Sequence, residues 1–121
     1  DITDADSAFS MLFETGCDGI MVGRGALGNP YIFEEILAAL EQKNYTRPTG
    51  EQIFADIQAH ITALCELKGE YTGIRESRKH AAWYLKGMPN AAASRDKINR
   101  SENLADILNI IEGVCRHASA I

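Results

Sequence analysis

A short apolar run, a glycine-rich turn with one arginine and the start of a helix follow one another in residues 17–30. The apolar run, residues 18–22, is bounded by glycines and is short for a helix, so it predicts a buried strand. Backbone amides of the turn and the guanidinium of Arg24 would converge on one point, which is a natural site for a phosphate. The first hypothesis is therefore that the turn holds the phosphate of a nucleotide cofactor.

Two α/β architectures could contain this turn. Residues 23–28 match the G-x-G-x-x-G pattern of dinucleotide-binding folds. However, Asn29 and Pro30 put the helix start after the third glycine, and no second strand with an acid follows about 20 residues later. A (β/α)₈ barrel fits better, because the loops after its strands seven and eight commonly bind phosphate. A tight turn that leaves Arg24 in solvent is the third interpretation.

The flanking residues extend the barrel interpretation. Thr3 is a candidate hydroxyl N-cap for an amphipathic helix over residues 4–15, which Gly16 ends. Pro30 suits the first position of a second helix, over residues 30–42. The order would then be the end of strand seven, helix seven, strand eight and helix eight of a barrel.

Beyond a polar linker at residues 43–48 no strand-like alternation recurs, so a domain boundary is expected there. Thr49 and Gln52 have the pattern of a capping box, and the helix they start is expected to end near Lys68. Three further helices are predicted, over about residues 73–87, over about residues 91–98 and from an N-cap at Ser101 onward. The predicted fold is mainly α, with a helical bundle over residues 49–121. The last α/β piece of a TIM barrel, with one short strand, precedes it over residues 1–48.

The composition excludes several classes of protein. No apolar run approaches the ~20 residues that a membrane span needs. The three cysteines are far apart and form no C-x-x-C pair, so we expect no metal site and place the chain in the reducing cytoplasm. The chain starts at Asp1 without a methionine, and we expect it to be a fragment of a longer protein.

Charge is distributed unevenly along the chain. Residues 68–100 carry eight Lys/Arg against three Asp/Glu, a net of +5, whereas the remainder carries four against fourteen, a net of −10. A basic segment on an acidic chain indicates a local contact surface for a polyanion.

The predicted helix over residues 73–87 concentrates this charge. Arg75, Lys79 and Lys86 fall in one narrow sector, with Arg78 beside it. An apolar stripe lies about a third of a turn away, formed by Ile74, Ala81 and Leu85. The sector is either a solvated surface or a contact surface for a phosphate backbone. Trp83 and Tyr84, next in this helix, are expected to pack rather than to stack on bases. No nucleophile–base pair or paired carboxylates stand out anywhere in the chain.

Taken together, these motifs resemble the C-terminal part of bacterial tRNA-dihydrouridine synthases, and among them the B-type. The resemblance rests on Asp1-Ile2, on residues 18–30, on the Arg-x-x-Arg-Lys-His-x-x-Trp-Tyr-Leu-Lys-Gly pattern of residues 75–87, and on Arg95 with Asn99. It implies an FMN-dependent barrel that reduces uridine in tRNA to dihydrouridine with NADPH, and a helical domain that helps to hold the tRNA.

The resemblance also implies roles for particular residues. Asp1, Gly23 and Arg24 match cofactor-binding positions for FMN. The helical domain implies RNA-binding positions at Arg75, Arg78, Lys79, His80, Lys86 and Arg95. The family's catalytic cysteine lies on an earlier segment, so no catalytic residue is assigned. No tightly bound cofactor is expected in this chain.

The sequence therefore predicts a C-terminal fragment of an FMN-dependent tRNA-dihydrouridine synthase, an oxidoreductase, that is itself inactive. Its expected partner is tRNA. Two alternatives remain open: a stand-alone helical module that binds nucleic acid or protein, and a fragment of a flavin-barrel oxidoreductase acting on small molecules. The uridine that is modified and the oligomeric state are not specified by the sequence.

Overall fold

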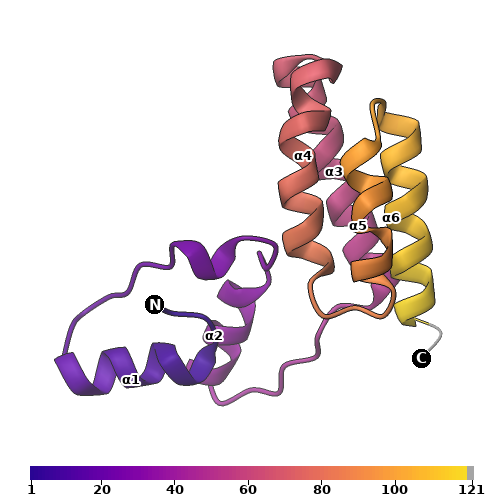
Figure 1. The fold of residues 1–121 in the computed structure, drawn as a ribbon. Helices are drawn as coiled ribbons and strands as arrows, with labels where there is room; N and C mark the ends of the chain where they lie inside the picture. The colour runs from indigo at the N-terminus through magenta and orange to yellow at the C-terminus, as the bar shows by residue number, and fades with distance from the viewer. Residues whose placement is uncertain (120–121) are drawn as a thin grey trace. The chain divides into compact units, whose positions relative to one another are not determined.

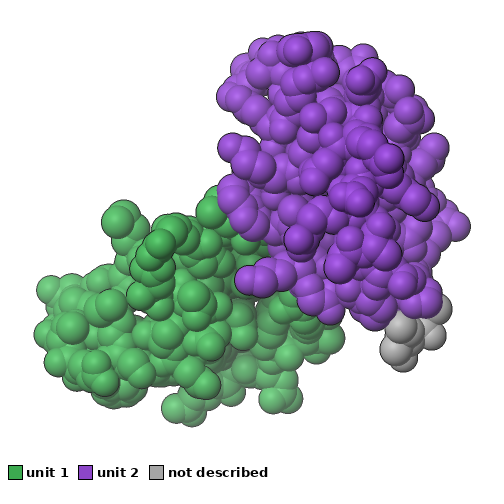
Figure 2. All heavy atoms as spheres, viewed as in Figure 1, with its two compact units in different colours: residues 1–47 green, residues 48–121 purple. Residues whose placement is uncertain are grey.

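The computed structural model describes residues 1–119, which belong to two compact units. The first unit is Asp1–Arg47 and the second is Pro48–Ile121. Figure 2 shows the two units in different colours. The described residues form α-helices, one short 3₁₀ helix and no strand, so the mainly α prediction is confirmed.

The first unit begins with helix α1 (Ala5–Thr15). Its N-cap is Asp4, whose carboxylate accepts from the Ser7 amide at 2.8 Å in a capping box. The prediction of Thr3 as the cap is wrong by one residue, because the Thr3 amide instead donates to the Ser7 hydroxyl. Gly16 ends the helix with a left-handed backbone, as the sequence predicts.

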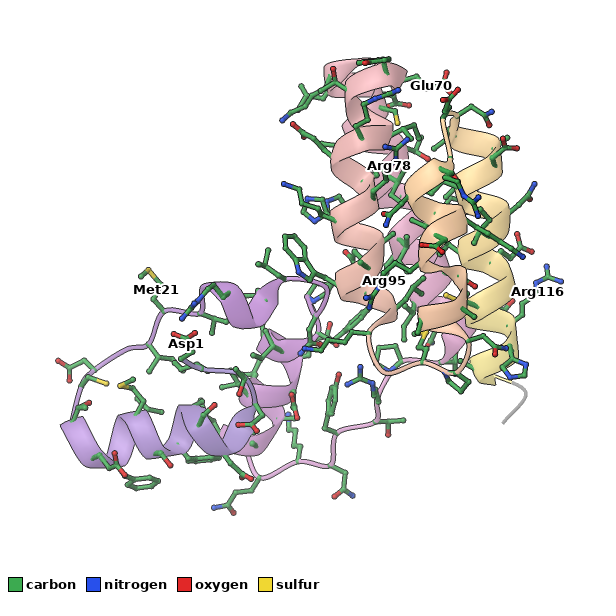
Figure 3. All side chains as sticks on the ribbon, viewed as in Figure 1. Asp1, Met21, Glu70, Arg78, Arg95 and Arg116 are labelled. Atoms are coloured by element: carbon green, nitrogen blue, oxygen red, sulfur yellow. The ribbon has the colours of Figure 1, made fainter. Side chains whose placement is uncertain are left out.

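The predicted strand over residues 18–22 is not a strand in the structure. Ile20 and Val22 pack against the small core of the first unit, whereas Met21 between them is 89% exposed (Figure 3). This alternation is that of a strand, but a strand needs a neighbour to pair its amides and carbonyls. Residues 1–119 supply no such neighbour, so the segment stays irregular.

Helix α2 (Ile32–Leu40) is shorter than the predicted span of 30–42. Pro30 lies in a turn before it, and Tyr31 flanks the helix without a side-chain cap. Only part of the apolar face is covered: Ile32 and Ile36 are buried, but three large apolar side chains are about half exposed, namely Phe33, Leu37 and Leu40.

The second unit is a bundle of four helices (Figure 1): α3 (Gly50–Lys68), α4 (Glu70–Leu85), α5 (Ala91–Arg100) and α6 (Leu104–Ser119). Helix α3 packs against α4 and α6, and α5 packs against α4 and α6. The capping box predicted at Thr49 and Gln52 is confirmed by two reciprocal hydrogen bonds of 2.8 and 3.2 Å. The buried core comes from one face of each helix: Ile53, Ile57, Ile61, Ile74, Ala81, Leu85, Ile98, Ile107, Ile111, Val114 and Cys115.

Helices α3 and α4 approach most closely at Gly73. A Cβ atom at this position would lie 2.7 Å from the Cα atom of Cys65 and 3.0 Å from its backbone nitrogen. The prediction that α4 begins near Gly73 is therefore wrong, because this glycine serves helix contact rather than a helix end. The break is at Gly69, which has a φ of 85° and lets α4 begin one residue later.

The start of α6 is fixed from two sides. Asn103 accepts from the Asp106 amide at 2.9 Å, and Glu70 of α4 accepts from the Leu104 amide at 2.8 Å. Figure 3 shows Glu70 at the start of α4, near the first turn of α6. Ser101 is not the N-cap that the sequence predicts, because its hydroxyl donates to the Lys97 carbonyl of α5 instead.

The three thiols differ in their surroundings. Cys17 is exposed in the first unit, Cys65 is half-buried on α3, and Cys115 is buried on α6. Burial raises the pKa of Cys65, helped by the charge of Glu70, and burial alone raises the pKa of Cys115 to about 11. None of the helices among the described residues is both long enough and apolar enough to span a membrane.

Candidate functional site

The glycine-rich turn forms a 3₁₀ helix, η1 (Arg24–Ala26), in which the Ala26 amide donates to the Gly23 carbonyl at 3.1 Å. Gly25 is required here for steric reasons, because a Cβ atom would overlap the Ile2 carbonyl oxygen. Apart from the two neighbouring residues, no atom of residues 1–119 lies within 4 Å of a Cβ atom built at Gly23. The turn is thus fixed to residue 2 on one side and open at Gly23.

The turn brings two of the predicted cofactor residues together. The Arg24 guanidinium donates to the Asp1 carboxylate in an ion pair, although the residues are 23 positions apart. Both side chains are accessible, with 81% of Arg24 and 53% of Asp1 exposed. Solvent screens such an exposed pair, so it contributes little to stability and leaves the guanidinium available to another anion.

On α4 the predicted basic side chains have different environments. Arg75 stacks over the Tyr71 ring, with the guanidinium carbon 3.5 Å from the ring centroid, and donates to the Tyr71 carbonyl at 3.0 Å. Lys79 is exposed. Glu76, between them, is paired with Lys68 of α3 at 2.8 Å, and this hydrogen bond lowers the pKa of Glu76.

Arg78 is half-buried and is held by a contact within the bundle. Its guanidinium donates to the Ser101 carbonyl at 2.6 Å, which ties α4 to the α5–α6 connection (Figure 3). Its Nε atom is buried and has no hydrogen-bond partner among the described residues. The structure thus gives Arg78 a structural contact that the sequence did not indicate.

His80 lies in an aromatic cluster between α3 and α4. Its ring centroid is 4.7 Å from that of His60 and 5.3 Å from that of Trp83, and His60 Nδ1 is 3.0 Å from the Tyr84 hydroxyl. The sequence indicated no link between His60 and His80, since they are 20 residues apart. Burial lowers the pKa of His80, and the charges of His60 and Lys79 lower it further, against the opposing effect of Glu76.

This shift predicts a pH dependence of stability. Because the folded pKa of His80 lies below its usual 6.5, the unfolded chain binds the proton first as pH falls through that value. The temperature midpoint of thermal unfolding should therefore decrease as the pH is lowered from about 7.5 to about 5.5. His80→Gln should reduce this slope, as measured by circular dichroism at several pH values. His117→Gln, on the exposed end of α6, is the control, and equal slopes in wild type and His80→Gln would contradict the prediction.

Lys86 and Arg95 line one cavity between the end of α4 and α5, together with Asn99. Both cations are exposed, and neither forms an ion pair within residues 1–119. The six predicted RNA-binding residues therefore divide into three groups: the half-buried Arg75 with the exposed Lys79, the cavity residues Lys86 and Arg95, and the half-buried Arg78 and His80, which contact other parts of the bundle. Among the described residues no three His, Cys, Asp or Glu side chains are arranged to hold a metal ion.

The comparison with known protein families bears on both units. The family model described as "Dihydrouridine synthase (Dus)" matches residues 1–119. The chain belongs to the dihydrouridine synthase family. The resemblance noted in the sequence is thereby confirmed, and the match runs through the glycine-rich turn as well as the basic helix.

Curated members of the dihydrouridine synthase family show the same relationship. The chain is 45% identical over 96 residues to a "Probable tRNA-dihydrouridine synthase" of Mycobacterium tuberculosis strain H37Rv, which covers 78% of the chain and 25% of that protein. It is 39% identical over 114 residues to "tRNA-dihydrouridine synthase B" of Vibrio cholerae, covering 93% and 35%. It is 40% identical over 114 residues to the protein of that name from Shewanella oneidensis, with the same coverage. The chain thus spans about a quarter to a third of the length of these relatives.

Two residues that shape the site were not among those predicted from the sequence. The Tyr71 ring stacks under the Arg75 guanidinium. This contact could have been predicted, because residues four apart in a helix lie on the same face. His60 could not have been found in this way, because only the packing of α3 on α4 brings it to His80.

Proposed function

We propose that this chain is the C-terminal part of an FMN-dependent tRNA-dihydrouridine synthase, which reduces uridine in tRNA with NADPH. Residues 1–48 would be the end of the FMN-binding barrel, and residues 49–121 a helical domain that binds tRNA. One observation carries the proposal: the dihydrouridine synthase match extends over both units, residues 1–119. The names of the relatives supply tRNA as the substrate class. The proposed location is the cytoplasm.

The glycine-rich turn fits the phosphate group of FMN. The Arg24 guanidinium is 81% exposed and is paired with a carboxylate, so its donors are already directed at an anion. The open space at Gly23 would let a phosphate approach the backbone closely. Arg24 would therefore hold the phosphate, and Asp1 would orient the guanidinium. FMN, when bound, supplies hydride transfer to the uracil ring.

The exposed half of helix α2 supports the assignment of the first unit to a barrel. Phe33, Leu37 and Leu40 line a shallow apolar pocket with Ile20 and Val22, and the residues of the first unit do not cover it. Helices of a (β/α)₈ barrel bury such a face against the sheet. We propose that this face packs on the remaining strands of the barrel in the whole enzyme.

The chain's own cysteines are not proposed as the proton donor of the reaction. Cys115 is buried with a raised pKa, and Cys65 faces the backbone of Gly73 in the contact between α3 and α4. Cys17 is exposed on the segment that precedes the irregular residues 18–22. The general acid is therefore proposed to come from another segment of the synthase.

Deletion of the gene, in a strain with no second dihydrouridine synthase, should remove dihydrouridine from tRNA, as measured by mass spectrometry of digested tRNA. The wild-type gene should restore it. A gene with Arg75→Glu and Lys79→Glu should restore much less. A charge-assisted contact is worth about 1.5 kcal/mol, or roughly tenfold in affinity, so losing two lowers affinity by roughly 100-fold.

The matched control is Lys43→Glu with Arg116→Glu, which makes the same change in charge at exposed residues outside α4 and α5. This control should restore dihydrouridine as the wild type does. Unchanged tRNA after deletion would exclude the synthase proposal. Full restoration by the α4 variant would instead mean that the synthase does not use Arg75 and Lys79 to bind tRNA.

A further inference from the structure

The cavity between α4 and α5 combines an apolar floor with a positively charged edge. It has a volume of about 240 Å³. Ala82, Leu85 and Met88 contribute apolar surface, while Lys86, Arg95 and Asn99 contribute polar groups. Arg95 extends from α5 and is labelled in Figure 3.

The two cations of this cavity are not neutralised by the chain. Within residues 1–119 no acidic residue lines the cavity, and neither Lys86 nor Arg95 forms an ion pair. Asp96 follows Arg95 directly in the sequence, but it is exposed on α5 and does not line the cavity. The cavity therefore carries two positive charges that an anionic ligand would neutralise.

The size and chemistry of the cavity indicate one class of ligand. A cavity of about 240 Å³ has room for a flat ring such as a nucleobase. Two cations at the edge suit one phosphate, and the apolar floor suits the face of a ring. The amide of Asn99 offers both a donor and an acceptor to the edge of a base.

We propose that this cavity binds a single unstacked nucleotide of the RNA. Its phosphate would lie on Lys86 and Arg95, and its base would lie against Ala82, Leu85 and Met88. This inference rests on the proposed function, because it specifies how the helical unit would hold tRNA. A basic surface alone contacts only the backbone, whereas the cavity would require that one nucleotide leave the base stack.

The test measures fluorescence anisotropy of an unmodified tRNA transcript with the full 121-residue chain at two salt concentrations. Ala92→Leu fills the cavity from α5 and changes no charge; it should weaken binding about tenfold and leave the salt dependence unchanged. Ala82→Leu fills it from α4 and should do the same. Ala93→Leu, an exposed neighbour outside the cavity, is the matched control and should bind as the wild type does.

Removal of charge gives an independent result. Lys86→Gln should weaken binding and lower the slope of log affinity against log salt by about 1, because one phosphate contact is lost. Lys97→Gln is the matched control, since Lys97 is exposed on α5 but does not line the cavity. Equal affinities for Lys86→Gln and Lys97→Gln, with Ala92→Leu and Ala82→Leu unaffected, would overturn the cavity proposal and leave tRNA binding intact.

A direct titration separates a nucleotide from a bare phosphate. Uridine monophosphate should shift the amide resonances of residues 82–99 in wild type but not in Ala92→Leu, whereas inorganic phosphate should shift fewer of them. Identical shifts with both ligands would mean that only the two cations are used, which overturns the proposal.

Absence of salt-dependent tRNA binding by the wild-type chain would overturn the RNA-binding function and this inference together. Circular dichroism of each variant verifies that the bundle is folded.

Discussion

Gly73→Ala should lower the midpoint of thermal unfolding of the helical bundle by roughly 12 °C or more. The added Cβ atom would lie 2.7 Å from the Cα atom and 2.8 Å from the Sγ atom of Cys65. Because the obstacle is largely backbone, α3 and α4 must move apart. Such overpacking costs about 3 kcal/mol, or roughly 12 °C or more in a unit of this size. Thermal unfolding followed by circular dichroism gives both values.

Gly113→Ala is the matched control for this substitution. Gly113 lies inside α6, where, apart from its chain neighbours and the nearby backbone of its own helix, no atom of residues 1–119 is within 4 Å of an added Cβ atom. Alanine should therefore stabilise the bundle by about 0.5–1 kcal/mol through helix propensity alone. Adding Cys65→Ala to Gly73→Ala should recover little, because the Cα and nitrogen atoms of residue 65 remain. Equal unfolding midpoints for the two glycine variants would contradict the close approach of α3 and α4.

Arg78→Met should destabilise the protein rather than act mainly on RNA binding. The substitution removes a hydrogen bond of 2.6 Å from a charged donor to the Ser101 carbonyl, in a half-buried position. Hydrogen bonds to charged groups contribute about 1.5–3 kcal/mol, and methionine retains most of the apolar contact of the arginine stem. The expected loss is about 1.5 kcal/mol, or roughly 6–12 °C in the unfolding midpoint.

Lys79→Met is the comparison that separates stability from binding. Lys79 is exposed on the same helix and has no hydrogen bond or ion pair among the described residues. Its loss should change stability by less than about 0.5 kcal/mol while weakening tRNA binding roughly tenfold. If Arg78→Met left the unfolding midpoint unchanged and weakened tRNA binding as Lys79→Met does, Arg78 would be an RNA contact after all.

Local sequence signals predicted those parts of the fold that depend on neighbouring residues. The capping box at Thr49 and Gln52 and the left-handed stop at Gly16 were confirmed, since both need only a few consecutive residues. The buried stripe of Ile74, Ala81 and Leu85 was also confirmed. Errors arose where distant groups decide the outcome. Residues 18–22 have the alternation of a strand but no pairing partner among residues 1–119. Gly73 was predicted to mark a helix end, but it allows the close contact between α3 and α4.

The candidate site was predictable to a similar degree. The resemblance placed Asp1 and Arg24 together, and the structure pairs their side chains, yet their role toward FMN stays a prediction. Charge counting found the basic segment but could not tell Arg78, which bonds to a carbonyl 23 residues away, from Lys79, which does not. Nor could spacing alone reveal that Lys86 and Arg95 share a cavity, because the turn between α4 and α5 brings them together.

The graded burial of the three thiols gives the chain an internal set of chemical reporters. A thiolate is the form that reacts with alkylating reagents, and both access and a low pKa favour it. Because Cys17 is exposed in the folded chain, labelling should begin there. Cys65 becomes reactive when α3 and α4 separate, and Cys115 only when the bundle opens. The order of modification in the folded chain should thus follow the burial of the three thiols, with no added tag.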